Sequence, residues 1–198
     1  MRIAPLLACS LILAAGMAAA APKVGQPAPA FSAVNSLGKT VKLSDYAGKF
    51  VVLEWTNDGC PFVKKHYHGN MQGLQKDATA KGAVWLSVIS SAPGQQGHVD
   101  GAGAERLTRE RGAAPSAVLL DASGTVGRLY EAKTTPHMFI IDPKGTLVYA
   151  GGIDSIPSAD PADIAQAKPY VKTALAQAMA GQPVAEAVTK PYGCSVKY

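Results

Sequence analysis

The residue that most directly predicts chemistry in this sequence is Cys60. It follows a nearly continuous apolar run, residues 50–57, which predicts a buried strand, and it precedes a segment with helical periodicity. Backbone N–H groups at the start of a helix are unpaired and the helix dipole favours negative charge, so a thiol placed there ionises readily. Lys64 and Lys65, one turn further on, would favour the thiolate. We therefore expect Cys60 to be an exposed nucleophile, with a buried structural cysteine as the alternative.

The first 21 residues carry the features of a secretory signal peptide. Arg2 supplies a positive charge, residues 6–13 form a short apolar core, and residues 17–22 offer the small side chains that a signal peptidase needs. The apolar core is short for a membrane span, and no second candidate follows it. We predict a signal peptide over residues 1–21, export to the periplasm, and one mature domain over residues 22–198 with no membrane contact.

Removal of this leader leaves two cysteines in the mature chain, Cys60 and Cys194. Two such thiols can form a disulfide in an oxidising compartment. Cys194 follows Gly193 in the short tail after the last predicted helix, and glycine permits a close backbone approach. We predict that Cys60 and Cys194 can form one intramolecular disulfide. The alternative is a disordered tail whose Cys194 pairs with another molecule.

A carboxylate, Glu54, interrupts the apolar run before Cys60. Burying a carboxylate costs free energy unless the group is paired or protonated. From the residues alone, Glu54 is either a strand-end glutamate paired to a lysine or a protonated acid.

His66 and His68 add a third kind of chemistry near Cys60, because imidazole and thiolate are ligands of soft metals, as in a copper carrier. Residues i and i+2 of one helix face apart, so both histidines can reach one ion only if the helix is broken at Gly69. We prefer to interpret His66 as a solvated helix residue, and we predict no cofactor.

The order of elements predicts an α/β fold. Apolar runs and turn signals indicate a hairpin, a β-α-β-α-β-α series, a second hairpin and a last helix. The β-α-β units imply parallel strands, and the closing hairpin adds an antiparallel edge, so the central sheet is mixed and flanked by helices. The long helices are expected over residues 61–81 and 162–180, and the main strands over residues 50–57, 83–90, 116–121, 137–142 and 146–154.

Two segments resemble the thioredoxin superfamily: EWTNDGCPFVKK around Cys60, and TTPHMFIIDPKGTLVYAG from Thr134 onward. The chain is most similar to exported, peroxiredoxin-like proteins of the redoxin group, which share the start CPFVKKHY and a tail of the type GCS-[IV]-K. The resemblance implies a thioredoxin-like fold and a cis Thr135–Pro136 bond that faces the redox cysteine and shapes a substrate groove. It also implies that Glu54, six residues before Cys60, is the buried acid that assists proton transfer.

Around Cys60 the sequence differs from the motifs of both thioredoxins and peroxiredoxins. Thioredoxins carry C-x-x-C, whereas Val63 stands at the second cysteine position. Peroxiredoxins carry P-x-x-x-T-x-x-C, whereas Leu53 and Asn57 stand at the proline and threonine positions. A resolving thiol must therefore come from elsewhere, for which Cys194 is the candidate, and peroxidase activity is expected to be weak.

Three functions follow as hypotheses. The first is a periplasmic thiol-disulfide oxidoreductase or redox accessory protein in which Cys60 attacks, Cys194 resolves, Glu54 manages the proton, and Thr135 and Pro136 bind substrate. The second is a non-enzymatic binding module that uses the same groove, and the third is a copper carrier. The partner of the first would be a protein thiol or disulfide. Nucleic acid is not expected, because the net charge of +5 is scattered rather than gathered in a stripe.

Overall fold

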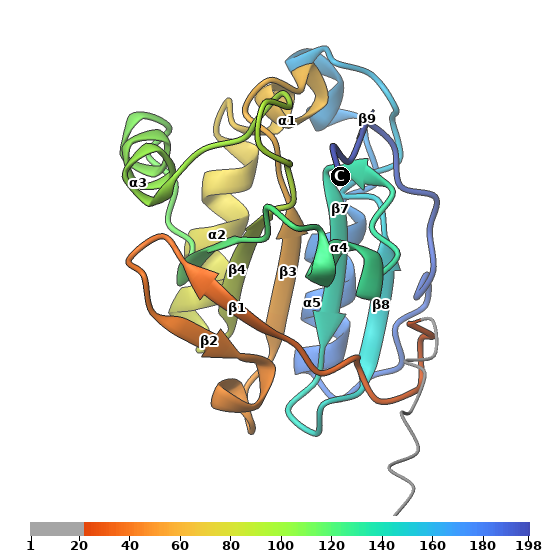
Figure 1. Cartoon of the computed structure of the whole chain (residues 1–198). Helices are drawn as coiled ribbons and strands as arrows, with labels where there is room; N and C mark the ends of the chain where they lie inside the picture. Colours follow the sequence, from red (N-terminus) through yellow and green to blue (C-terminus); the bar gives the residue numbers. More distant parts are fainter. Residues whose placement is uncertain (1–21) are drawn as a thin grey trace, which may run out of the picture.

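A computed structural model describes residues 22–198, and the predicted signal peptide, residues 1–21, lies outside the described residues (Figure 1). The centre is a seven-stranded mixed sheet in the order β2-β1-β5-β4-β3-β7-β8. The sequence prediction of a mixed sheet flanked by helices is confirmed. The strands are β1 (Ser32–Asn35), β2 (Thr40–Lys42), β3 (Val51–Trp55), β4 (Val84–Ile89), β5 (Ala117–Leu120), β7 (His137–Ile141) and β8 (Leu147–Gly151).

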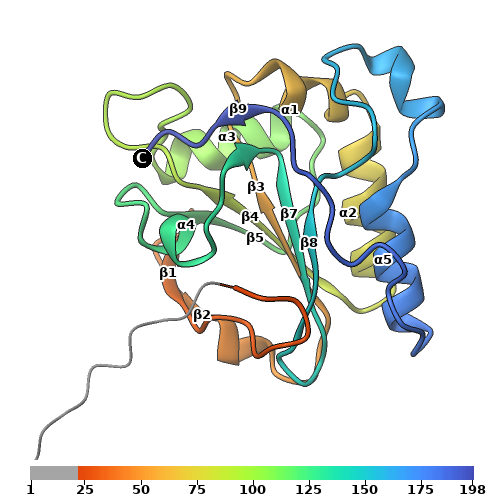
Figure 2. The ribbon, with the colours of Figure 1, turned by 90° about the vertical axis from the view of Figure 1, so that its right-hand side faces the viewer.

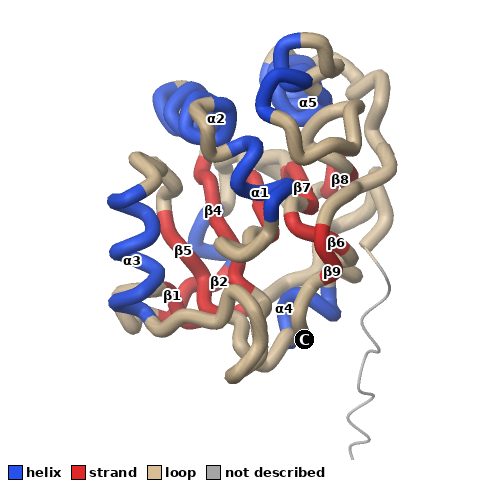
Figure 3. Tube along the Cα trace, turned by 90° about the horizontal axis from the view of Figure 1, so that it is seen from above, coloured by secondary structure: helices blue, strands red, loops and turns tan. Residues whose placement is uncertain are grey.

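Strand β3 lies between its parallel neighbour β4 and its antiparallel neighbour β7. All of its residues are buried, because helices or loops cover both faces of the sheet. Successive side chains alternate between the faces: Val52 packs with the layer under the helices α2 (Asn70–Ala80) and α5 (Tyr170–Met179). Leu53 and Trp55 pack on the opposite layer, beside α4 (Thr125–Leu129). Figure 3 shows these layers from above. Helix α3 (Gly101–Glu110) packs by Ala104 against β4 and β5.

The long helix expected over residues 61–81 is wrong in one respect, because the structure breaks it into two. Helix α1 (Pro61–His66) ends at Tyr67, and α2 begins after Gly69. Gly69 has a φ of 111°, which a side chain with a Cβ rarely adopts, and its N–H donates to Oε1 of Gln72 at 3.0 Å. The apolar stripe continues across this break, so periodicity alone did not reveal it.

The helix expected over residues 162–180 is also wrong in extent. Residues Pro161–Ala165 form a 3₁₀ helix, and α5 begins only at Tyr170. Pro169 lies between them, and a proline disfavours helical geometry at the residue before it. None of the helices within residues 22–198 combines the length and the apolar character needed to cross a bilayer.

The tail, expected only as a short extension, is docked along the sheet. It runs from α5 past β8, as Figure 2 shows from the side, and Val188 forms a parallel β-bridge with Ala150. It ends in a short strand, β9 (Cys194–Ser195), which pairs antiparallel with β6 (Thr134–Thr135). The fold therefore brings the last residues of the chain to the segment that precedes β7.

Candidate functional site

Cys60 lies where the sequence predicts it, at the junction of β3 and α1. It is the N-cap residue of α1, with Pro61 at the first helical position. The preceding loop is fixed by Asn57, whose Oδ1 accepts from the N–H of Gly59 at 2.8 Å and whose Nδ2 donates to the carbonyl of Gln96 at 2.9 Å. The thiol therefore has a defined position at the carboxyl end of the central strand.

The Thr135–Pro136 peptide bond is cis, as the family resemblance implies. Both residues are buried, and they lead directly into β7. The thiol of Cys60 donates to the backbone carbonyl of Thr135, with 3.1 Å between Sγ and O. The cis proline segment and Cys60 thus lie side by side, although they are 75 residues apart in the sequence.

Cys194 comes to the same place through β9, where it is the register partner of Thr135. Oγ1 of Thr135 donates to the carbonyl of Cys194 at 3.5 Å. Gly193 makes this approach possible: its φ is 135°, and a Cβ at this position would lie 2.0 Å from the Thr135 carbonyl oxygen. Cys60, Cys194, Thr135 and Pro136 therefore lie in one cluster.

The pKa values of the two thiols are shifted in opposite directions. Burial opposes ionisation of Cys60, but hydrogen bonds from the thiol and backbone N–H of Cys194, and from the side chain of Thr135, bring the pKa of Cys60 below its ordinary value. Burial and the contact with Cys60 raise the pKa of Cys194 to about 11, and Lys197 opposes this rise only in part. The cluster thus favours ionisation of Cys60 over ionisation of Cys194.

Two sequence predictions about Cys60 are wrong. The residue is fully buried rather than exposed, since its sulfur lies against the docked tail. The lowering of its pKa comes from hydrogen bonds, one of them from the backbone N–H of Val63 at the start of α1 as expected, and not from the lysines. Lys65 is itself buried, and its ammonium group donates to the carbonyl of Ile156 at 3.0 Å.

Glu54 is fully buried, and its neighbours form a separate network. Oε1 accepts from the hydroxyl of Tyr67 at 2.8 Å, and Oε2 accepts from Gln75, Trp85 and Ser87 at 3.1, 2.8 and 2.9 Å. These partners are uncharged, so the pairing with a lysine is wrong. The contacts connect β3 to β4 and α2, and the proton-transfer role of Glu54 stays a prediction.

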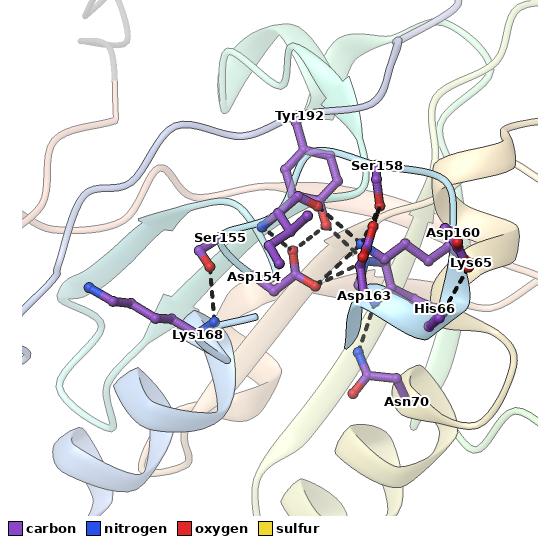
Figure 4. Close-up of polar contacts among 12 residues, drawn as sticks. Lys65, His66, Asn70, Asp154, Ser155, Ser158, Asp160, Asp163, Lys168 and Tyr192 are labelled. Carbon is purple, nitrogen blue, oxygen red and sulfur yellow. Dashed lines mark hydrogen bonds and ion pairs between the residues drawn. The ribbon is translucent and has the colours of Figure 1, made fainter. Parts of the chain in front are cut away.

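A buried polar cluster that was not predicted from the sequence lies beside α1 and is drawn in Figure 4. Lys65 and His66 from α1 lie close to Asp154, which follows β8, and to Tyr192 of the tail. His66 is therefore buried rather than solvated. Tyr192 stands two residues before Cys194, so the tail sequence around that cysteine was the available signal.

The copper-carrier hypothesis has weak geometric support. His68 lies beyond the end of α1, and the helix is indeed interrupted at Gly69. Both ring nitrogens of His66, however, are hydrogen bonded, Nε2 to Tyr192 and Nδ1 to Asn70. Within residues 22–198 no three His, Cys, Asp or Glu side chains gather as metal ligands would.

Comparison with known proteins agrees with this architecture. The model of the AhpC/TSA family matches residues 24–150. A solved structure of a protein from Geobacillus kaustophilus, described as an uncharacterized conserved protein, is 27% identical with a TM-score of 0.75, over 89% of this chain and 92% of that chain. No curated protein gives a match.

Two further structures have described redox roles. A protein of Chlorobium tepidum described as a thiol:disulfide interchange protein DsbE is 27% identical with a TM-score of 0.54, over 66% of this chain and 85% of that chain. The exposed lipoprotein thioredoxin of Streptococcus pneumoniae strain TIGR4 is 27% identical with a TM-score of 0.51, over 70% of this chain and 96% of that chain. These similarities establish the thioredoxin-like fold and support a redox function.

The acidity of Cys60 is directly testable. In the reduced protein, the ultraviolet absorbance of the thiolate should give a half-point for Cys60 below the ordinary cysteine value of about 8.5. Cys194→Ala should raise this half-point, because it removes one of the hydrogen bonds that favour the thiolate. A half-point at or above the ordinary value, or one that Cys194→Ala leaves in place, would contradict the arrangement.

Stability should fall as the pH is lowered from about 6.5 to 4. Burial lowers the pKa of His66 and of His137 to about 4, whereas an unfolded histidine has a pKa of about 6.5. Between pH 6.5 and 4 the unfolded chain binds more protons than the folded chain. The free energy of unfolding therefore decreases, as the pH is lowered, by up to about 1.4 kcal/mol per pH unit for each histidine. Urea unfolding across this range measures the slope.

His137→Gln should flatten this slope, and His68→Gln, at an exposed position, should leave it as in the wild type. Equal slopes in all three proteins would show that burial does not set the protonation of His137.

Proposed function

This chain belongs to the AhpC/TSA family, and we propose that within it the protein is an exported thiol-disulfide oxidoreductase whose redox pair is Cys60 and Cys194. The observation that carries the proposal is the direct interaction of the two thiols beside the cis proline. Val63 stands at the usual place of a resolving cysteine, and the position of Cys194 beside Cys60 supports Cys194 as the resolving thiol.

The first step is attack by the Cys60 thiolate on a partner disulfide. The partner's S–S bond breaks, a mixed disulfide forms between Cys60 and one partner sulfur, and the other sulfur leaves as a thiolate that takes a proton from solvent. A pKa of Cys60 below its ordinary value increases the fraction of the nucleophilic thiolate. Thr135 and Pro136 border the place where the partner segment would lie.

The second step is attack by Cys194 on the Sγ of Cys60. Contact with the Cys60 sulfur helps to keep Cys194 protonated in the reduced protein. Once Cys60 is bound to the partner it carries no charge, so that contribution disappears and Lys197 favours the Cys194 thiolate. The Cys60–Cys194 disulfide forms, the partner leaves as a second thiol, and two electrons have passed from the protein to the partner.

The buried position of Cys60 requires the tail to move in this cycle. With β9 paired to β6, the Cys60 sulfur has no access to a protein disulfide. Release of the short β9 pairing would expose both Cys60 and the edge of β6, where an extended partner segment can pair in its place. We therefore expect the partner to be a protein thiol or disulfide in an extended segment.

Glu54 would take up or return a proton during exchange, and its four hydrogen bonds also hold β3 in place.

Export through the predicted signal peptide, residues 1–21, would place the mature domain, residues 22–198, in the periplasm, where disulfide exchange partners are available. Weak peroxidase activity stays a prediction, since Asn57 holds the loop at the position of the peroxiredoxin threonine.

Trapping of the mixed disulfide tests this function. When reduced protein reacts with oxidised glutathione, Cys194→Ser should retain glutathione on Cys60, whereas the wild type should release it and form its internal disulfide. Loss of the resolving thiol should prolong the mixed disulfide by on the order of a hundredfold, because an adjacent thiol reacts far faster than one from solution. Mass spectrometry over time follows both species.

Cys60→Ser is the matched control and should form an adduct on Cys194 more slowly than Cys194→Ser forms one on Cys60, because burial still raises the pKa of Cys194 after the contact with the Cys60 sulfur is lost. An adduct as short-lived in Cys194→Ser as in the wild type would show that Cys194 does not resolve Cys60. A binding module without exchange chemistry would react slowly at both cysteines.

A further inference from the structure

The tail that carries Cys194 is anchored by Tyr192 in a polar cluster which the exchange steps do not use. Figure 4 shows this cluster between α1, the loop after β8 and the tail. Its charged residues are almost fully buried, with the side chains of Lys65 and Asp154 0% and 5% exposed. Nζ of Lys65 lies 3.7 Å from Oδ2 of Asp154.

A buried ion pair is a weak source of stability, because the charges lose their hydration. Lys65 offsets this loss by donating to the carbonyl of Ile156 at 3.0 Å and to the hydroxyl of Ser158 at 3.4 Å. Oδ2 of Asp154 accepts no hydrogen bond from any described residue, while Oδ1 accepts from the N–H of Ile156 at 3.1 Å. The cluster is therefore organised around Oδ1, the atom that also receives Tyr192.

Tyr192 closes a directional chain of hydrogen bonds. Its hydroxyl donates to Oδ1 of Asp154, so its oxygen is left to accept from Nε2 of His66 at 3.1 Å. Nδ1 of His66 in turn accepts from Nδ2 of Asn70 at 2.8 Å. This order needs a neutral His66 with its proton on Nε2, and burial lowers the pKa of His66 to about 4. Each polar group in this series of hydrogen bonds has its partner only when the Tyr192 hydroxyl is present.

The ring of Tyr192 ties this network to the redox site. It packs edge-on against Phe62, with 5.9 Å between the ring centroids, and the Lys65 ammonium lies 5.6 Å from its centroid. Phe62 is two residues after Cys60, and Tyr192 is two residues before Cys194. The aromatic contact therefore lies beside the contact between the two thiols and joins the same two segments.

We propose that Tyr192 is a positioning residue: its hydroxyl, held by Asp154 and His66, fixes the register of the tail so that Cys194 faces Cys60. The inference deepens the proposed function and rests on it for its chemical meaning. On the other side of Cys194 the tail is held by its backbone, since the N–H of Val196 donates to the carbonyl of Lys133 at 3.2 Å. The hydroxyl of Tyr198 also donates to the carbonyl of Ala132 at 2.8 Å, so the tail is held on both sides of Cys194, and Tyr192 is the side-chain anchor that precedes the cysteine by two residues.

Tyr192→Phe is the test variant, because it removes the hydroxyl and keeps the ring against Phe62. Asp154 retains the N–H of Ile156, so the fold should persist. Tyr46→Phe is the matched control, since Tyr46 lies on the 3₁₀ helix Leu43–Tyr46 at the opposite end of the sheet (Figure 1). All measurements use the reduced mature protein.

Amide hydrogen exchange reports the position of the tail. Tyr192→Phe should speed exchange in residues 193–197 by roughly tenfold, as expected for one lost hydrogen bond to a charged group, and leave β3 and β4 unchanged. The half-point of the Cys60 thiolate should rise towards that of Cys194→Ala, whereas Tyr46→Phe should match the wild type in both measurements. Tail exchange equal to the wild type, or faster exchange spread evenly over the sheet, would overturn the proposal.

These readouts separate the positioning role from the redox function. If Cys194→Ser resolves glutathione like the wild type while Tyr192→Phe still loosens residues 193–197, the proposed function fails and the positioning role stands. If Cys194→Ser traps the adduct and Tyr192→Phe leaves the tail unchanged, the function stands and Tyr192 does not position Cys194.

Discussion

The contact between the sulfur of Cys60 and the residue Cys194 is the interaction on which the rest of this structure depends. It requires a tail that returns across β8, a glycine at position 193 that lets the backbone reach Thr135, and a cis bond that turns the Thr135 carbonyl towards Cys60. Burial alone would keep Cys60 protonated, and the hydrogen bonds from Cys194 reverse that tendency. One contact therefore sets both the acidity of the nucleophile and its isolation from solvent.

Much of the site follows from local sequence, and the errors have a common physical origin. An apolar run followed by Cys60 and Pro61 is enough to predict a buried strand that ends at a helix start, and the Thr-Pro motif is enough to suggest the cis bond. Exposure of Cys60 and solvation of His66 were predicted wrongly because each is covered by segments far away in the chain. Such coverage depends on tail docking, for which Tyr192 and Gly193 gave only a short, local signal.

Two buried carboxyl groups near α1, those of Glu54 and Asp154, have different structural roles. Glu54 lies under the sheet face with four uncharged donors and joins β3, β4 and α2. Asp154, which follows β8 and is also buried, pairs with Lys65 and accepts a hydrogen bond from the hydroxyl of Tyr192 in the tail. The first network stabilises the platform that carries Cys60, and the second connects that platform to the segment that carries Cys194. Local stability in the tail can then differ from that of the sheet, as a movable resolving segment requires.

The most direct test of this account is a disulfide map of the mature protein, isolated without reductant and with its free thiols blocked by iodoacetamide. Mass spectrometry of its peptides should find Cys60 joined to Cys194 within one chain, in a monomer, and the bond should open under mild reduction. Two alkylated thiols after isolation under oxidising conditions, or a Cys194–Cys194 link between two copies, would contradict the claim that these cysteines form the redox pair.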